Sequence, residues 1–463
     1  MVFSSLTFLF YFLPIVLIIY YIVPKKFRNV VLFISSLLFY FYGEPKFGIL
    51  MIISIFLTYV HGILMDKYPQ HKKKFLISSI IISVGLLIIF KYTDFIISNI
   101  NMISKGNIEM LNLRLPIGIS FYTFQMISYI IDVYKGEAKV QKSFLKLATY
   151  VALFPQLIAG PIVRYTTIEK EIDDREYNFK NFSNGVRRFI IGLSKKILIA
   201  NVLADAINSF NASSEKTILF YWIYAIATTL QIYFDFSGYS DMAIGLGKML
   251  GFSFPENFNY PYISSSVTEF WRRWHITLST WFKDYVYIPL GGNRVGKIKW
   301  LRNILIVWFL TGLWHGAAWN FILWGVLYGI LLIIEKLGLL KILNKIPKAI
   351  SRIYVLFVTI IGFIIFSGNN IEEIFENIGG IFGIGTTGLI NKESIYCLFN
   401  YLSVIIIGII GATPIIKNVI NNIKKKNCKI INTLEPIVLS VLLIVCVSYL
   451  VDGSFNPFLY FRF

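Results

Sequence analysis

Long apolar runs separated by short basic clusters dominate the pattern of this chain. Residues Phe3 to Val23, Phe75 to Phe90, Ile350 to Phe366 and Pro436 to Val451 carry almost no charge. Each run approaches the length of about 20 residues that a helix needs to cross roughly 30 Å of hydrocarbon. Counted in this way, the chain contains about eleven transmembrane helices. The pattern therefore predicts an all-α polytopic membrane protein.

Two stretches depart from this regular pattern. Residues Leu115 to Pro161 and Ser264 to Gly292 mix apolar side chains with Pro, Gly, Arg and Asp. Irregular backbone at membrane depth must be shielded by protein or must line a cavity. We therefore expect short, broken or re-entrant helices beside a ring of regular helices, which together enclose a central chamber. No linker interrupts the chain, so residues 1–463 are expected to form a single membrane domain.

Composition and charge support the membrane class. Of all residues 56% are hydrophobic and only 15% are charged, whereas about 25% are charged in soluble domains. The net charge of +19 comes from short Lys and Arg clusters between apolar runs, which is typical of cytoplasmic loops and argues against nucleic acid as a partner. The three cysteines have no CxxC spacing and predict neither disulfides nor a metal site.

The basic clusters also predict the orientation, because Lys and Arg near membrane segments stay on the cytoplasmic side. Lys25–Arg28 follows the first apolar run, and Lys72–Lys74 comes two crossings later. Both clusters are cytoplasmic if the N-terminus lies outside. Lys424–Lys426 precedes the last apolar run, so the aromatic tail at residues 452–463 is also expected on the extracytoplasmic side.

One histidine stands inside an apolar run. His315 is the only side chain between Arg302 and Glu335 that titrates near neutral pH. Ionisable groups at membrane depth are costly and are candidates for function by default. A desolvated histidine favours its neutral form, which suits a general base near neutral pH. The alternative is a histidine that only makes an interhelical hydrogen bond.

The neighbours of this histidine favour a closed site. Gly312 and Gly316 allow other backbone or a ligand to approach closely. Trp314 and Trp319 could exclude water, and Asn320 is a further candidate for substrate binding or support.

A second histidine follows two arginines. His275 comes directly after Arg272, Arg273 and Trp274. Because a guanidinium pairs bidentately with phosphate, the arginines could hold an anionic phosphate-bearing donor. Anchoring of a helix end at the cytoplasmic face is the alternative. Two histidines are too few for a zinc site, which needs three or four ligands, and we expect no metal.

Two carboxylates also lie in an aromatic setting. Asp235 and Asp241 flank the sequence Phe-Ser-Gly-Tyr-Ser. They could orient a histidine or pair with the buried arginines, and a structural role is favoured. His61, near the end of an apolar run, and His71, in a basic loop, are not expected to take part in function.

Several ordered motifs carry a family resemblance. The chain resembles the membrane-bound O-acyltransferase superfamily, and within it the bacterial alginate O-acetyltransferase-like branch, which is related to the D-alanyl transfer proteins of teichoic acid modification. The motifs span nearly the whole chain: Met1–Ser5, Tyr40–Pro45, Leu115–Phe124, Pro155–Pro161, Asn257–Tyr262, Glu269–His275, Trp281–Arg294 and Leu313–Gly325.

The resemblance implies an acyltransferase of the bacterial plasma membrane, with His315 as the catalytic histidine and His275 as a second site position. The donor would be a cytosolic thioester, either acyl-CoA such as acetyl-CoA or an acylated carrier protein, and no cofactor would be bound. The acyl group would pass outward to an extracytoplasmic esterase-like partner of the SGNH type. The final acceptor would be an exported polysaccharide or a cell-wall polymer.

The tail has a resemblance of its own. Residues Phe458–Phe463 resemble the aromatic C-terminal motif of the small companion peptide in the D-alanylation system. This likeness predicts that the Tyr460 hydroxyl carries the acyl group between His315 and the outer partner. The alternative is an aromatic anchor at headgroup depth.

Two other functions compete with an enzyme. A transporter or lipid-linked saccharide flippase would use Asp235, Asp241 and the histidines as a path, but the sequence shows no internal repeat of the kind many transporters have. A non-catalytic scaffold of a cell-surface polysaccharide complex is the other alternative. The sequence does not identify the acyl group or the acceptor polymer.

Overall fold

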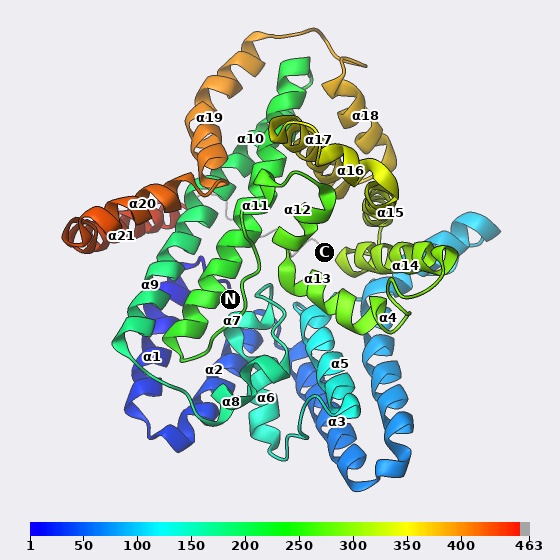
Figure 1. Ribbon diagram of the computed structural model, residues 1–463, viewed down its shortest axis with the longest axis vertical. Helices are drawn as coiled ribbons and strands as arrows, with labels where there is room; N and C mark the ends of the chain where they lie inside the picture. The colour runs from blue at the N-terminus through cyan, green and yellow to red at the C-terminus, as the bar shows by residue number, and fades with distance from the viewer. Residues whose placement is uncertain (454–463) are drawn as a thin grey trace. The chain divides into compact units, whose positions relative to one another are not determined.

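The computed structural model describes residues 1–453, and every regular element in that range is a helix (Figure 1). This confirms the all-α class. Six helical segments are long and apolar enough to cross a membrane, and a shorter apolar helix covers Phe8–Ile22. The count of about eleven crossings stays a prediction. The six are α3 (Phe47–Lys67), η3 with α4 (Pro69–Ser104), α11 (Ile218–Met249), α17 (Lys348–Ser367), α19 (Lys392–Gly411) and α21 (Cys428–Val451).

The helices form two compact units. The first contains residues 1–189 and 242–255, and the second contains residues 190–241 and 256–463. α9 (Phe179–Ser194) and α11 contribute residues to both. All predicted site residues that the structure describes belong to the second unit.

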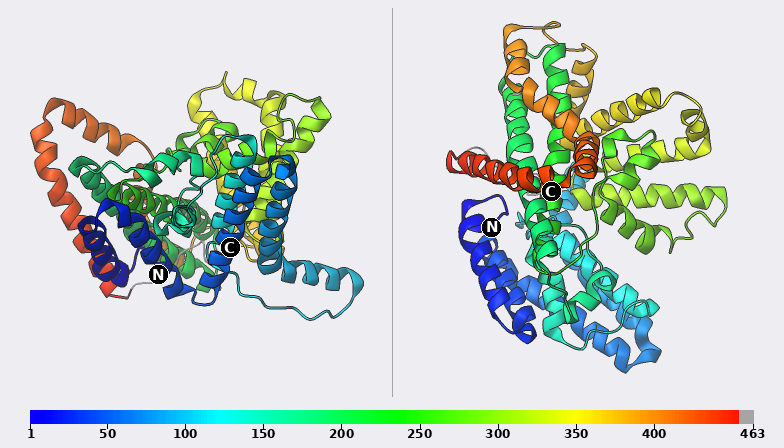
Figure 2. Two further views of the ribbon diagram at one scale, coloured as in Figure 1. Left: turned by 90° about the horizontal axis from the view of Figure 1, so that it is seen from below. Right: turned by 60° about the vertical axis from the view of Figure 1, so that its left-hand side comes forward.

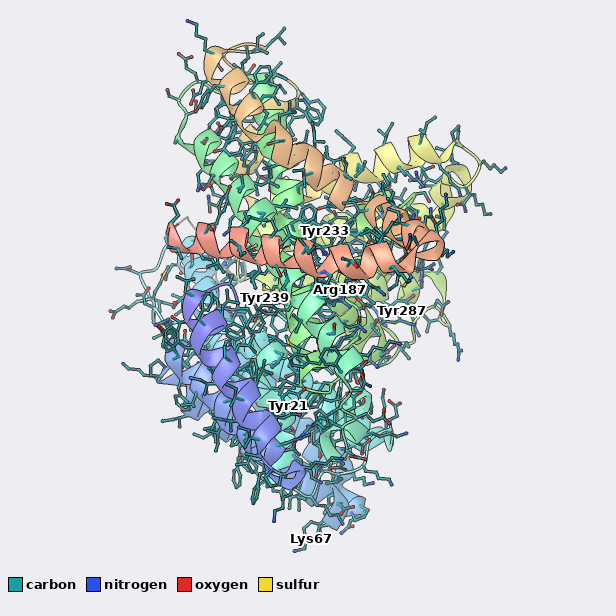
Figure 3. The ribbon with its side chains drawn as sticks, turned by 90° about the vertical axis from the view of Figure 1, so that its left-hand side faces the viewer. Tyr21, Lys67, Arg187, Tyr233, Tyr239 and Tyr287 are labelled. Carbon is teal, nitrogen blue, oxygen red and sulfur yellow. The ribbon has the colours of Figure 1, made fainter. Side chains whose placement is uncertain are left out.

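In the first unit, α3 and α4 form a long hairpin against which α5 (Ile119–Lys135) packs. Lys67, the last residue of α3, lies at the tip of this hairpin (Figure 3). The remaining helices of this unit are η1 (Phe8–Phe12), α1 (Leu13–Ile22), η2 (Lys25–Phe27), α2 (Arg28–Gly43), α6 (Phe144–Ala152), α7 (Phe154–Leu157) and α8 (Tyr165–Asp173).

The expectation of broken helices throughout Leu115 to Pro161 is wrong for its first part. α5 is an unbroken helix of 17 residues. No Pro or Gly interrupts it between Gly118 and Gly136, which both have left-handed φ angles and bound it at either end. Its polar residues are buried against neighbouring helices instead of breaking the backbone, and they include Gln125 and Asp132. The second part does break into the short helices α6 and α7.

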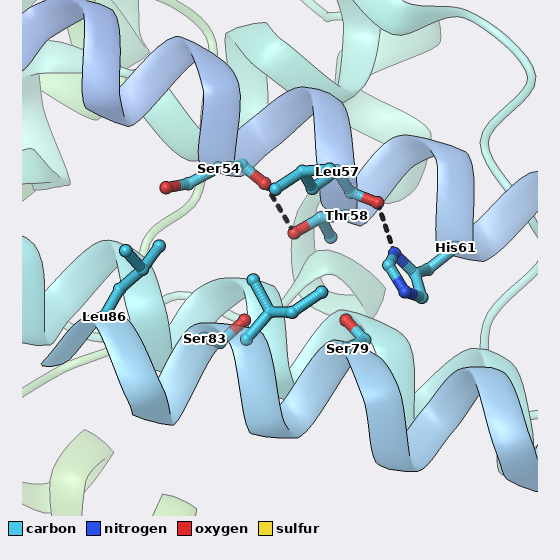
Figure 4. A pocket seen from close by; sticks show the side chains of 8 residues that line it. Ser54, Leu57, Thr58, His61, Ser79, Ser83 and Leu86 are labelled. Carbon is cyan, nitrogen blue, oxygen red and sulfur yellow. Dashed lines mark hydrogen bonds between the residues drawn. The ribbon is translucent and has the colours of Figure 1, made fainter. Parts of the chain in front are cut away.

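His61 lies in a small polar pocket between α3 and α4 (Figure 4). Its Nδ1 is 2.7 Å from the carbonyl oxygen of Leu57, and its Nε2 is 3.0 Å from the Ser78 hydroxyl. Since both ring nitrogens have protein partners, a structural role accounts for this histidine. The pocket is lined by hydroxyl groups from both helices: Ser54, Thr58, Ser79 and Ser83.

The second unit has an aromatic core around a pair of close helices. α14 (Lys297–His315) and α15 (Trp319–Ile334) form a hairpin, and α17 packs against α15 (Figure 1). Trp271, Trp274, Trp324, Tyr328 and Phe366 are all buried in this core. The other elements of this unit are η4 (Lys195–Asn201), α10 (Val202–Ala212), η5 (Pro261–Ile263), α12 (Val267–Arg273), α13 (Ile276–Phe282), η6 (Lys283–Tyr287), η7 (Glu335–Leu339), α16 (Leu340–Leu343), α18 (Ile371–Ile381) and α20 (Ile415–Lys426).

α20 is an amphipathic helix between two apolar ones. It joins α19 to α21 and forms a hairpin with α21, drawn in orange and red in Figure 2. Ile415, Ile416, Val419 and Ile423 follow the spacing of one helix face and are 39% to 54% exposed. None of its residues is buried by protein. Lysines and asparagines occupy the opposite face, and Lys424–Lys426 forms the last turn.

Candidate functional site

His315 is the last residue of α14. The backbone leaves the helix at Gly316, which is extended. A Cβ added to Gly312 or Gly316 would overlap Phe321 of α15. The two glycines therefore let α15 pack directly against the end of α14. The close approach predicted from these glycines is made by the protein itself.

Three aromatic rings surround the His315 imidazole. The ring centroids of Trp314, Trp324 and Phe366 lie 4.9, 5.0 and 5.1 Å from that of His315, at interplanar angles of 75° to 84°. The side chain of His315 is 8% exposed. Trp314 thus packs against the His315 ring. Trp319, the other residue expected to exclude water, is 47% exposed. Trp324 and Phe366 complete the enclosure of His315.

Asn320 supports this wall from the start of α15. Its side-chain amide is buried and donates a hydrogen bond of 3.0 Å to the carbonyl oxygen of Phe366, near the end of α17. The bond fixes the backbone of one residue that contacts His315. In the structure, Asn320 therefore holds a wall of the site in place.

His275 lies at the break between α12 and α13. It has φ 41° and ψ 53°, the left-handed region that few residues other than glycine adopt, although histidine is among those enriched there. Such a conformation costs on the order of 1 to 3 kcal/mol and persists only where the surroundings fix it. A strained and fully buried histidine at a helix break is a strong indication of a functional position.

The His275 ring is held by polar and aromatic contacts. Its Nδ1 lies 3.1 Å from Oδ1 of Asn257, and Phe236 packs against it in a T-shaped contact with centroids 4.6 Å apart. His275 lies outside the six long apolar helices. Burial lowers the pKa of its imidazole to about 3, so the ring is neutral at physiological pH.

Trp314 contacts both histidines. Its ring centroid lies 4.9 Å from that of His315 and 5.9 Å from that of His275. The break between α12 and α13 thus brings one histidine to the same indole as the other. Two residues that are forty positions apart in the sequence therefore contact the same side chain in the second unit.

The two arginines before His275 have different surroundings. Nε and Nη2 of Arg273 both lie 2.9 Å from Oε1 of Glu269, one helical turn earlier. Although burial acts to raise it, the hydrogen bonds from Ser265 and the ion pair with Arg273 hold the pKa of Glu269 below its usual value. Arg272 is exposed. Of the two, Arg272 is the side chain that is more exposed to an approaching phosphate group.

Asp235 and Asp241 form ion pairs with consecutive lysines of the π-helix η4. Asp235 contacts Nζ of Lys196, and their side chains are 1% and 2% exposed. Asp241 lies 2.6 Å from Nζ of Lys195, and this pair is 15% and 25% exposed. Gly238, between the two aspartates, lets the backbones approach, because a Cβ there would lie 2.8 Å from a carbonyl oxygen of α9. The partners seen are lysines, which the sequence interpretation did not single out.

Glu335 is a further residue that the sequence interpretation missed. It is fully buried and accepts hydrogen bonds from the backbone N–H groups of Val267 and Thr268, at 2.6 and 2.8 Å, and from the Thr268 hydroxyl at 2.7 Å. A carboxylate at a helix N-terminus is favourable because of the helix dipole. The first residue of η7, directly after α15, therefore holds the start of α12, the helix that leads to His275.

These features define a multi-pass membrane protein with a buried histidine site. Within residues 1–453, no three His, Cys, Asp or Glu side chains gather in a way that could hold a metal ion. The site offers imidazole nitrogens inside aromatic walls. Such groups can accept and return a proton away from bulk water.

Comparison with known proteins identifies the family. The model of the membrane-bound O-acyltransferase family matches residues 136–372, the part of the chain that contains both histidines. The chain belongs to the membrane-bound O-acyltransferase family, and it is an acyltransferase.

Named relatives are similar over most or part of the chain. A probable alginate O-acetylase of Pseudomonas putida is 37% identical, with all of both chains covered. A peptidoglycan O-acetyltransferase of Helicobacter pylori is 35% identical over 85% of this chain and 82% of the relative. A teichoic acid D-alanyltransferase of Bacillus subtilis is 31% identical over 48% of this chain and 59% of the relative. These relatives match the branches that the motifs indicated.

Proposed function

We propose that this acyltransferase is an O-acetyltransferase that moves an acyl group from a cytosolic thioester across the membrane, for O-acylation of an exported polysaccharide or a cell-wall polymer. The observation that carries the proposal is the enclosure of His315 by aromatic rings beside His275. The names of the relatives support the reaction class, since they include two kinds of O-acetylating enzyme.

His315 acts as the general base in this proposal. Its imidazole takes the proton of the acceptor hydroxyl while the hydroxyl oxygen attacks the thioester carbonyl. The carbon–sulfur bond then breaks, and the proton passes from His315 to the leaving thiolate. An ester and a free thiol result, so no further reactant is needed. His275, in contact with the same indole, binds or polarises the substrate.

The direction of transfer follows from the basic loops. With Lys25–Arg28 and Lys424–Lys426 on the cytoplasmic side, both termini lie outside. The donor, acetyl-CoA or an acylated carrier protein, then approaches from the cytoplasm, where the exposed Arg272 can contact its phosphates. The acyl group leaves outward to an esterase-like partner of the SGNH type.

Consumption of a thioester tests the proposal against its rivals. Purified protein in liposomes, given acetyl-CoA labelled in the acetyl group and a soluble polyol or oligosaccharide acceptor, is expected to release free CoA and form a labelled ester. A flippase or a scaffold consumes no thioester. If neither acetyl-CoA nor an acetylated carrier protein is consumed when the acceptor and the SGNH-type partner are both present, the proposed reaction is wrong.

Tyr460, which lies outside the described residues, is proposed as an acyl relay. The phenol oxygen attacks the thioester carbonyl, and the carbon–sulfur bond breaks. The phenol proton passes through His315 to the leaving thiolate, and the acyl group of the resulting tyrosyl ester is transferred to the outer partner. Mass spectrometry of the C-terminal peptide after incubation with acetyl-CoA is expected to show an acetyl adduct on Tyr460. Tyr460→Phe should abolish transfer to the partner. A peptide without the adduct, together with full activity of Tyr460→Phe, would exclude the relay.

A further inference from the structure

Asn257 is a fully buried residue that joins two parts of the second unit. Its backbone carbonyl accepts a hydrogen bond of 3.0 Å from the N–H of Ile276. Its side-chain nitrogen Nδ2 donates to the Ser240 hydroxyl of α11, at 3.0 Å. Its side-chain oxygen Oδ1 faces His275 and Thr277 at 3.1 and 2.9 Å. One side chain therefore contacts both α11 and the break between α12 and α13.

The orientation of the Asn257 amide follows from its partners. The backbone N–H of Thr277 lies 3.3 Å from the atom assigned as Oδ1. A backbone N–H can only donate, so this atom must be the oxygen and not the nitrogen. The opposite end is then Nδ2, which agrees with its contact to the Ser240 hydroxyl, a group that can accept. The orientation of the Asn257 amide group is thus fixed, because the backbone N–H of Thr277 can only donate.

The same reasoning fixes the proton on His275. Its Nδ1 faces an amide oxygen, which can only accept, so Nδ1 must carry the hydrogen. A neutral imidazole has one ring proton, and its other nitrogen, Nε2, then has the lone pair. We propose that Asn257 is a positioning residue that sets the Nδ1–H tautomer of His275, so that Nε2 accepts a hydrogen bond from a substrate hydroxyl. The part of this proposal that concerns the substrate hydroxyl rests on the proposed function.

This assignment separates two roles for His275. A neutral ring with the lone pair on Nε2 cannot donate a hydrogen bond to the thioester carbonyl. It can accept one from a second hydroxyl of the acceptor, beside the hydroxyl whose proton His315 takes. His275 therefore binds the acceptor substrate, an alcohol or polyol hydroxyl, and does not polarise the donor carbonyl.

The charged groups around His275 are consistent with a neutral ring. On α11, the carboxylates of Asp235 and Asp241 are paired with lysines. On α12, Glu269 is paired with Arg273. On α14, the titratable group beside the shared indole is His315. Each of these carboxylates already has a cationic partner other than His275.

Nitrogen-15 NMR of the protein labelled in histidine tests the tautomer directly. The chain has four histidines, and the signals of His275 are identified by their loss in His275→Gln. The expected result at neutral pH is a protonated Nδ1 and an unprotonated Nε2. A protonated Nε2 on a neutral ring would overturn the proposal. This measurement does not involve acyl transfer, so its outcome is distinct from a failure of the proposed function.

Asn257→Asp provides the second arm, because it keeps the shape and the acceptor oxygen but adds a negative charge. An opposite charge at this distance raises the pKa of an imidazole by about 1 to 3 units. The midpoint of the His275 signals is expected to move up by that amount. Activity should fall below the new midpoint, where Nε2 carries a proton, and return above it. An unmoved midpoint would contradict the positioning role.

Thr277→Val is the matched control. It removes one hydroxyl donor from the same Oδ1 atom but leaves the contact between Asn257 and His275 in place. The His275 midpoint and tautomer are expected to match those of the wild type, even where packing changes alter the rate. If Thr277→Val shifts the midpoint as Asn257→Asp does, the effect is general to the network, and the specific role of Asn257 is refuted.

Discussion

His315→Ala is expected to lower the rate of acyl transfer by about 10²- to 10⁴-fold, the contribution typical of a positioned general base. The imidazole is walled by Trp314, Trp324 and Phe366, which limit the access of bulk water as a substitute base. His315→Gln, closer in size to histidine, should lose activity to the same degree, because an amide does not accept a proton near neutral pH. The measurement is the turnover of acetyl-CoA in liposomes.

A folding control accompanies this prediction. The thermal midpoint of His315→Gln in detergent should stay close to that of the wild type, because the glutamine side chain occupies most of the space between the aromatic rings. His61→Gln is the matched control, because His61 is a partly buried histidine with protein partners at both ring nitrogens, in the first unit. Its activity should remain near the wild-type level. Wild-type turnover in His315→Ala would refute the role of His315 as base.

Asp235→Leu is expected to destabilise the protein by about 3 to 5 kcal/mol, the usual cost of leaving one charge of a buried pair without its partner. The side chains of Asp235 and Lys196 are 1% and 2% exposed, so water cannot solvate the remaining ammonium. The double variant Lys196→Met with Asp235→Leu should recover most of this loss, because it removes both charges. Thermal unfolding in detergent measures each step.

The neighbouring ion pair serves as a control for burial. Asp241 and Lys195 are 15% and 25% exposed, and solvent near a partly exposed pair screens the charges. Asp241→Leu should therefore cost clearly less than Asp235→Leu. If the double variant at positions 196 and 235 is no more stable than the single Asp235→Leu, the loss comes from packing and the electrostatic explanation is wrong.

The long apolar runs predict that helices are present but not where these helices begin and end. Phe75 to Phe90 predicts only the apolar half of α4, which runs from Lys72 to Ser104. Pro436 to Val451 likewise predicts only part of α21, which begins at Cys428 and continues through Pro436. Hydropathy detects the segment that lies in hydrocarbon, whereas a helix ends only where its backbone is interrupted. Polar residues such as those of α5 do not interrupt it when neighbouring helices bury them.

The sequence predicts the two histidines of the candidate site but not the residues that hold them in place. His315 and His275 stand out because a titratable side chain in an apolar segment is rare. Asn257 has no charge, and its partner His275 lies 18 residues away, a separation that no local periodicity predicts. Glu335 contacts Thr268 across 67 residues. Such contacts depend on how segments that are distant in the sequence pack together, which the spacing of residues within a single helix does not encode.

The amphipathic helix α20 has a consequence for movement along the membrane normal. If it sinks, its lysines enter hydrocarbon, and if it rises, its isoleucines enter water; both changes cost free energy. A helix of this kind at the membrane surface is expected to oppose displacement of α19 and α21, which it joins, along the membrane normal. Tilting or rotation of these two helices remains open to the enzyme, whereas a piston-like displacement of either one is opposed in both directions.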